Sequence, residues 1–228
     1  MNEDTSSSEY ASESELPLGE TPEVLERLRT DAQQTLADAF TAHRERFWNL
    51  VSFRMHHRVA ARVDVDDVLQ EAFVAAGLRL EHYLRDPSFS LFVWLRMIVA
   101  QTLIDVHRRH MGTEMRDAGR EVSIASPRFP QTTSVSLAGH LISDQTSPSG
   151  VVVRDESAEK LAAAIETMSE IDQETIALRH FEGLTNRETA EVLGLSITAA
   201  SNRYVRALGR LREILQESSP ENSSSEIK

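Results

Sequence analysis

The stretch of sequence that decides the fold lies near the carboxyl end, where residues 184–208 read LTNRETAEVLGLSITAASNRYVRAL. Residues 187–193 have the composition of a short helix, and Gly194 follows where a tight turn needs a positive φ. Ser196 stands where a serine can cap a second helix, and the small Ala190 lies where the two helices would touch. These are the parts of a helix-turn-helix, and the segment predicts that motif.

The second helix of this motif is expected to have one buried and one polar face. Ala200, Tyr204 and Leu208 recur at four-residue spacing, and Leu211 and Leu215 continue the row. An ordinary helical hairpin would explain this apolar row equally well. It would not explain why the turn glycine, the small residue and the serine cap occur together at the spacing of the motif. The candidate DNA-binding residues are polar side chains suited to base edges or phosphates: Arg187, Ser196, Thr198, Ser201, Asn202, Arg203 and Arg206.

The composition of the whole chain is typical of a helical protein. Among 228 residues there are only 9 Gly and 7 Pro, and long stretches are rich in Ala, Leu, Glu and Arg. The absence of Cys excludes disulfides and thiolate metal sites. No apolar run is long enough to cross a bilayer, and the acidic, Ser-rich start is unlike a signal peptide. We therefore expect an all-α protein without cofactor, metal or membrane insertion.

The net charge of −12 argues superficially against a nucleic-acid partner, but the charge is unevenly distributed. Residues 1–26 contain 8 acidic residues and no Lys or Arg, whereas residues 105–110 and 203–212 are locally basic. Because the local field decides whether phosphate is attracted, the total charge does not exclude DNA binding.

Composition also divides the chain into parts. Helical periodicity begins at Thr21 and Pro22, which fit an N-cap and a first helical position, and continues to about residue 61. Further helices are expected from Asp64 to about residue 84 and over about residues 90–110. We predict two small helical domains joined by a flexible linker, with these bounds: acidic disordered tail 1–22, first domain 23–112, linker 113–151, second domain 152–217 and disordered tail 218–228.

Two segments of the first domain add a family resemblance. They read DVDDVLQEAF from Asp64 and FVWLRMIVAQTLIDVHRR from Phe92. Together with residues 184–208, their order and spacing resemble those of extracytoplasmic-function sigma factors, which direct RNA polymerase to promoters. The resemblance covers roughly residues 35–112 and 155–217, called region 2 and region 4 in that family. The stretch at residues 115–122 resembles a branch common in planctomycetes.

The resemblance implies roles by position. Region 4 would read the −35 element with the helix-turn-helix and contact the beta flap of the polymerase. One polar face of region 2 would dock on the clamp helices of the beta-prime subunit: Asp64, Asp66, Asp67, Gln70 and Glu71. Another set would recognise and melt the −10 element by holding an opened strand: Arg96, Gln101, His107, Arg108 and Arg109.

The function that the resemblance implies is promoter-specific initiation in the cytoplasm, with core RNA polymerase and promoter DNA as partners. An anti-sigma factor is a further candidate partner. An alternative is a one-component regulator that binds a palindromic duplex as a dimer. An enzyme is disfavoured, because the sequence has no glycine-rich phosphate loop and no metal-ligand spacing. The family often has Arg-Asn where this chain has Ala100 and Gln101, so promoter preference is not transferred.

Overall fold

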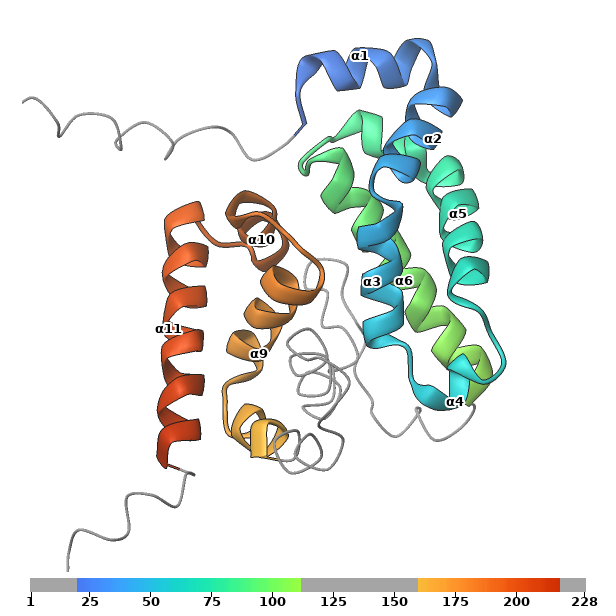
Figure 1. Cartoon of the computed structure of the whole chain (residues 1–228). Coiled ribbons are helices and arrows are strands. Elements are labelled where there is room, and N and C mark those ends of the chain that lie inside the picture. The colour runs from blue at the N-terminus through green and yellow to red at the C-terminus, as the bar shows by residue number, and fades with distance from the viewer. Residues whose placement is uncertain (1–19, 112–159, 218–228) are drawn as a thin grey trace, which may run out of the picture.

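The computed structural model describes residues 20–111 and 160–217, and within those ranges every regular element is a helix (Figure 1). This confirms the predicted all-α fold. The predicted linker at residues 113–151, the tail at 218–228 and residues 1–19 of the acidic tail lie outside the described residues. Within the described ranges, no helix combines the length and apolar character needed to span a bilayer.

The amino-terminal part is divided more finely than the sequence predicted. Thr21 caps the first helix and Pro22 opens it, as expected. The helical periodicity predicted to about residue 61 does not form one continuous helix, because Asp31 leaves the helical conformation at φ −142° and its carboxylate accepts a hydrogen bond from the backbone N–H of Gln34. The chain therefore forms four short helices: α1 (Pro22–Thr30), α2 (Ala32–Ala42), α3 (Arg44–Arg54) and α4 (His57–Ala60).

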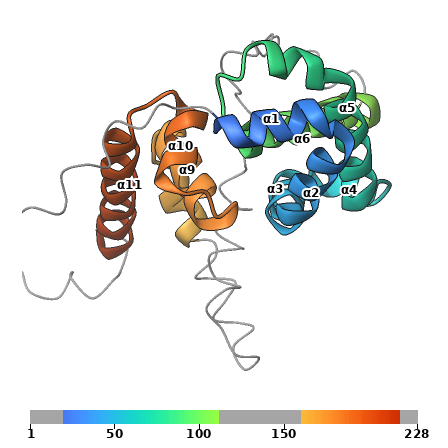
Figure 2. The same cartoon turned by 90° about the horizontal axis from the view of Figure 1, so that it is seen from above.

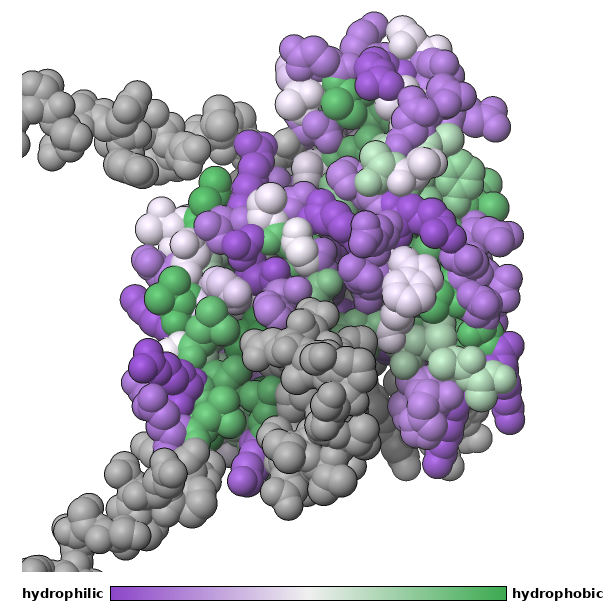
Figure 3. Space-filling view, in the orientation of Figure 1, coloured by the Kyte–Doolittle hydropathy of each residue, from purple (hydrophilic) through white to green (hydrophobic). Residues whose placement is uncertain are grey.

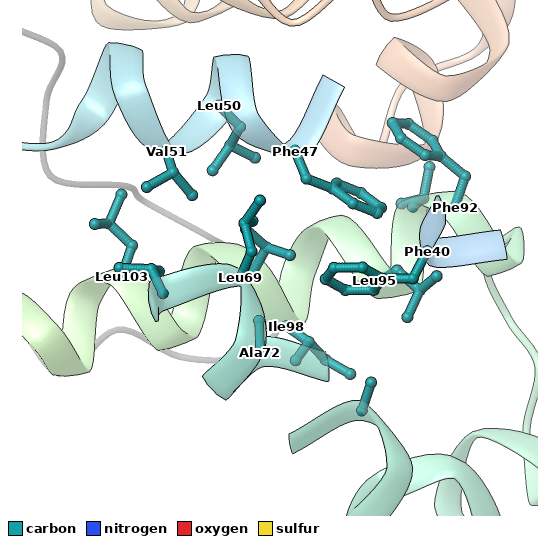
Figure 4. Packing of buried hydrophobic residues seen from close by; sticks show 14 of the residues in the cluster. Phe40, Phe47, Leu50, Val51, Leu69, Ala72, Phe92, Leu95, Ile98 and Leu103 are labelled. Carbon is teal, nitrogen blue, oxygen red and sulfur yellow. The ribbon is translucent and has the colours of Figure 1, made fainter. Parts of the chain in front are cut away.

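Two long helices complete this half, α5 (Val65–Arg85) and α6 (Leu91–Met111). Asp64 caps α5 as predicted, since its carboxylate accepts from the backbone N–H of Asp66 at 3.0 Å. The core lies where α3, α5 and α6 meet, and Figure 4 shows how their side chains interlock. Its central residues are Phe40, Phe47, Leu50, Leu69, Ala72, Leu95, Ile98 and Leu103.

The described part of the carboxyl-terminal half opens with helical residues 160–166, followed by α9 (Glu170–Ile176), which continues as the π-helical segment η2 (Ala177–Phe181). Next come α10 (Asn186–Leu193) and α11 (Ile197–Glu217). Thr185 caps α10 in a capping box with Glu188, which satisfies two backbone N–H groups at once.

The two halves pack directly against each other (Figures 1 and 2). Leu178 and Leu184 of the carboxyl half belong to the amino-terminal core. Phe53 of α3 belongs instead to the carboxyl-terminal core, where it stacks on Phe181 with 4.6 Å between ring centroids. Composition predicted separate domains on a flexible linker, and it gave no indication that the domains share their cores.

Candidate nucleic-acid interface

The helix-turn-helix has the geometry that the sequence predicted. Gly194 ends α10 with φ +65°, in the left-handed region that favours glycine. The backbone N–H of Leu195 then donates to the carbonyl of Ala190 at 2.9 Å, and Ser196 Oγ accepts from the backbone N–H of Ala199 at 3.1 Å. Ala190 is fully buried, which lets α10 approach α11 closely. The predicted turn, small residue and cap are confirmed.

The buried face of α11 differs from the prediction. Ala200, Ala207 and Leu211 are buried, whereas Leu208 is 40% exposed and Val205 is 65% exposed. The prediction of a buried Leu208 is wrong because an α-helix turns by about 100° per residue. Two four-residue steps from Ala200 therefore drift by about 80°, whereas the seven-residue step to Ala207 drifts by only about 20°.

The polar face of α11 holds most of the predicted DNA-binding residues. Ser196, Thr198, Asn202 and Arg206 are exposed, and Ser201 and Arg203 are half-buried. A hollow of about 260 Å³ lies on this face, lined by Ala199, Asn202, Arg203, Arg206 and Arg210. Three of the predicted residues, Asn202, Arg203 and Arg206, therefore line one hollow together with Arg210.

The arginines of this hollow are held from behind by a buried carboxylate that sequence reasoning missed. Asp172 is 1% exposed, accepts a hydrogen bond from Arg203 Nη1 at 3.4 Å and forms an ion pair with Arg210 Nη2 at 2.7 Å. Ser169 Oγ donates to the same carboxylate at 2.6 Å. Asp172 therefore fixes two guanidinium groups beside Arg206, although it lies far from them in the sequence.

Arg187 is not part of this surface. It lies on α10, pairs with Glu191 at 3.4 Å and lines a separate hollow of about 450 Å³. Ser90 and Phe92 at the start of α6 line the same hollow. The structure thus separates Arg187 from the other residues proposed to contact the −35 element.

The residues predicted to dock on polymerase lie along α5. Asp67, Gln70 and Glu71 are exposed, and Asp66 pairs with Arg44 at 2.6 Å. Two large apolar side chains that sequence reasoning missed lie further along this helix, Val74 at 61% exposed and Leu78 at 83%. The signal that would have found them is their spacing: Asp67, Glu71, Val74 and Leu78 follow at intervals of four, three and four residues, so they form one stripe. We call these four residues the α5 stripe.

The residues predicted to act at −10 do not form one surface. Arg108 and Arg109 are exposed at the end of α6, and Arg109 pairs with Glu71 at 2.6 Å. Gln101 is half-buried and donates from Nε2 to Asp105 at 3.2 Å.

His107 is 2% exposed, and its Nε2 accepts a hydrogen bond from the backbone N–H of His56 at 3.2 Å. Burial and the neighbouring His56 lower its pKa, which favours the neutral form that can accept this bond. This placement argues against a direct DNA contact by His107.

Arg96 is fully buried and is bound to a carboxylate of the other half of the chain. Its Nε donates to Glu182 Oε2 at 2.6 Å and its Nη2 donates to Oε1 at 3.0 Å. Arg54 donates to the same Oε1 from Nη2 at 2.6 Å and from Nε at 2.9 Å, and it also pairs with Glu174 at 2.8 Å. Burial alone would raise the pKa of Glu182, but the two guanidinium groups outweigh it and hold the pKa below its ordinary value.

Further ion pairs extend this contact along α10. Arg46 of α3 makes a two-pronged pair with Glu188, at 3.0 and 2.7 Å, and its guanidinium lies 3.7 Å from the centre of the Phe92 ring. Ser90 donates to Glu191 from its backbone N–H and its hydroxyl, at 2.9 and 2.8 Å. Hydrophilic side chains are also visible where the two halves adjoin in Figure 3.

The contact thus joins two surfaces of opposite charge. We call Arg46, Arg54 and Arg96 the arginine face of the amino half, and the three carboxylates that pair with them the acidic face of the carboxyl half: Glu174, Glu182 and Glu188. Neither face was predicted from the sequence. No cluster of three potential metal ligands occurs among residues 20–111 and 160–217.

The sequence is similar to those of known transcription factors of bacteria. The chain matches the family models "Sigma-70 region 2" over residues 40–113 and "Sigma-70, region 4" over residues 158–211. It is similar to the RNA polymerase sigma factor CnrH of Cupriavidus metallidurans, with 28% identity over 156 residues that cover 68% of this chain and 75% of CnrH. It is also similar to the ECF RNA polymerase sigma-E factor of Escherichia coli K12, with 24% identity over 188 residues that cover 76% of this chain and 89% of the relative.

Among solved structures, a similar chain is CnrH in complex with the cytosolic domain of CnrY. The identity is 23%, the TM-score is 0.47, and the match covers 86% of this chain and 97% of that chain. The two sigma-70 matches lie on the two helical halves in the order expected from the sequence, region 2 on α2–α6 and region 4 on α9–α11. The chain belongs to the sigma-70 family of RNA polymerase sigma factors, and within it to the extracytoplasmic-function type.

Proposed function

We propose that this sigma factor docks on core RNA polymerase through α5 and directs initiation through two DNA contacts, α11 at the −35 element and α6 at the −10 element. The observation that carries the proposal is the polar hollow on α11, within a helix-turn-helix that lies inside the region 4 match. A recognition helix of such a motif enters the major groove and presents polar side chains to base edges.

Within the −35 contact, the exposed and the anchored residues have different roles. Thr198, Asn202 and Arg206 are exposed and can reach base edges, where a well-formed bidentate contact discriminates by about 1–3 kcal/mol. Arg203 and Arg210 are held by Asp172, and we assign them to phosphates, which fix the register of a protein on the duplex.

For polymerase docking we propose the α5 stripe as the centre of the contact. Asp67 and Glu71 supply negative charge for a basic partner helix, and Val74 and Leu78 supply exposed apolar surface that such a partner can cover. This extends the docking site by about two turns beyond the residues predicted from the sequence.

At the −10 element, Arg108 and Arg109 are the exposed basic residues proposed to hold the opened strand, and the half-buried Gln101 is a further candidate on the same helix. Arg96 can take part only when region 4 has moved away, because its guanidinium is bound to Glu182 in this conformation.

Narrower parts of the proposal rest on the family. They are a contact of region 4 with the beta flap, a cytoplasmic location, an anti-sigma factor as a further partner, and action without catalysis, cofactor or metal. The resemblance of residues 115–122 to a planctomycete branch stays a prediction, because the relatives named above do not test it.

The test of the proposed function is run-off transcription with purified core polymerase, followed by footprinting. We expect factor-dependent transcripts, and we expect the double variant R203A/R206A to lose protection at −35. Arg212, exposed on the same helix but outside the hollow, provides the control R212A, which should keep it. Tight binding of the chain alone to a palindromic duplex, with no transcript, would support the one-component regulator instead.

A further inference from the structure

The contact between the arginine face and the acidic face is unusual because it buries its charges. Arg96 and Glu182 have side chains only 1% exposed, and the side chain of Arg54 is 0% exposed. Desolvation makes such a cluster a weak source of stability compared with an apolar contact of the same size, so its presence needs another explanation. Removing one partner, by contrast, leaves the other charges buried and uncompensated, so the closed contact depends on every member of the cluster. We call this contact, which holds the two halves together, the latch.

The proposed function requires this contact to open, and the inference below rests on that function. Elements at −10 and −35 lie about 25 base pairs apart, which is about 85 Å of duplex at 3.4 Å per base pair. A compact chain of 228 residues measures only about 45 Å across. One chain in the closed conformation cannot reach both elements, so the arginine face is uncovered on the promoter.

The geometry of the covered face indicates what binds it once it is uncovered. Two guanidinium groups from different helices, Arg54 on α3 and Arg96 on α6, donate to one oxygen of Glu182 at 2.6 and 3.0 Å. A pair of guanidinium groups converging on one oxyanion suits a phosphate as well as a carboxylate. Arg46 adds a third guanidinium to the same face, at the amino end of α3.

We infer that the arginine face is a binding site for the phosphate backbone of promoter DNA, and that region 4 covers it in the free chain by placing the Glu182 carboxylate where a phosphate would bind. Arg54 and Arg46 thereby join Arg96 as residues that act near the −10 element. The free chain is closed and binds DNA weakly, and opening exchanges an internal carboxylate for an external phosphate.

The first experiment tests the latch without polymerase or DNA. The chain has no Cys, so Ala61→Cys and Gln216→Cys, both exposed and in different halves, accept a dye pair for energy transfer. Replacing Glu182 by Gln should shift the closed-to-open ratio about 100-fold towards open, because one partner of a buried cluster is lost. Glu213→Gln, on the exposed side of α11, makes the same change in net charge and should leave the transfer efficiency unchanged. Unchanged transfer in E182Q would overturn the latch.

The second experiment tests the site with a fluorescent single-stranded DNA oligonucleotide and the full chain. E182Q should bind about tenfold more tightly than wild type, because the competent fraction has risen. The slope of log affinity against log salt should stay close to that of wild type, because both chains bind through the same open state, and loss of one phosphate contact should lower this slope by about 0.7. R54M in the E182Q background should remove most of the gain. If E182Q fails to fold by circular dichroism, Glu174→Gln, which breaks the other Arg54 pair, replaces it.

The outcomes separate the parts of the inference. An open E182Q chain with wild-type affinity for the oligonucleotide would overturn the phosphate site, and so would an equal gain in E213Q, which would mean that net charge alone is responsible. Run-off transcription by the same variants reports on the proposed function separately, because wild-type transcription does not depend on whether Glu182 or another contact closes the free chain.

Discussion

Shortening the two apolar side chains of the α5 stripe should weaken binding to core RNA polymerase without destabilising the fold. Leu78→Ala removes three carbons from a side chain that is 83% exposed, and Val74→Ala removes two from one that is 61% exposed. At about 0.8 kcal/mol per buried methylene, scaled by the exposed fraction that a partner can cover, the losses are about 2 and about 1 kcal/mol. Their sum of about 3 kcal/mol corresponds to an affinity for core polymerase that is about 150-fold weaker.

The assay is competition with labelled wild-type chain for core polymerase. Val205→Ala is the matched control, because Val205 is equally exposed at 65% but lies on α11. The V205A chain should compete for core polymerase as wild type does. All variants should have the unfolding temperature of wild type, since none of these side chains contributes to a hydrophobic core. A V74A/L78A chain that competes within about threefold of wild type would refute the docking assignment of these residues.

Three other predictions concern charge, acid and the turn. Asp67→Arg reverses a charge at the exposed start of the α5 stripe and should weaken core association at least about tenfold, measured in the same competition. Because the pKa of Glu182 is lowered, the ionised carboxylate stabilises the closed state above about pH 4.5, and this contribution is lost as the pH falls through the lowered pKa. Energy transfer should therefore decrease on acidification, and it should decrease less in E182Q. Gly194→Ala forces a side chain into φ +65° and should destabilise region 4 by about 1–2 kcal/mol, whereas Gly209→Ala within α11 should stabilise it by about 0.5–1 kcal/mol, both read from thermal unfolding.

The features that the sequence predicted well are local ones. The positive φ of Gly194 and the caps at Thr21, Asp64 and Ser196 are determined by residues within three or four positions of each other. Their physical causes, backbone sterics and unsatisfied N–H groups at helix ends, need no knowledge of the rest of the molecule. The helix-turn-helix, which carries the −35 proposal, is built from such features.

The features that the sequence did not predict are long-range. Arg54 and Glu182 are separated by 128 positions, and nothing near either residue indicates its partner. Asp172 reaches Arg203 across 31 positions in the same way. Leu208 shows a subtler failure, because a four-residue row follows an α-helix for only about two turns before it drifts off the buried face. Burial of Arg96 and His107 follows from packing between helices, which composition does not reveal.

The α5 stripe and the arginine face differ in one respect that fixes the order of events. The stripe is exposed in the closed chain, whereas Arg96 is covered by Glu182. Docking on the clamp helices therefore does not require opening, and a ligand that binds a site present in both conformations is insensitive to their ratio. We expect a peptide of the beta-prime clamp helices to bind wild type and E182Q with affinities within about twofold, measured by calorimetry. Tenfold tighter binding to E182Q would mean that region 4 also shields the stripe, and polymerase would then have to select the open chain before docking rather than open a chain already bound.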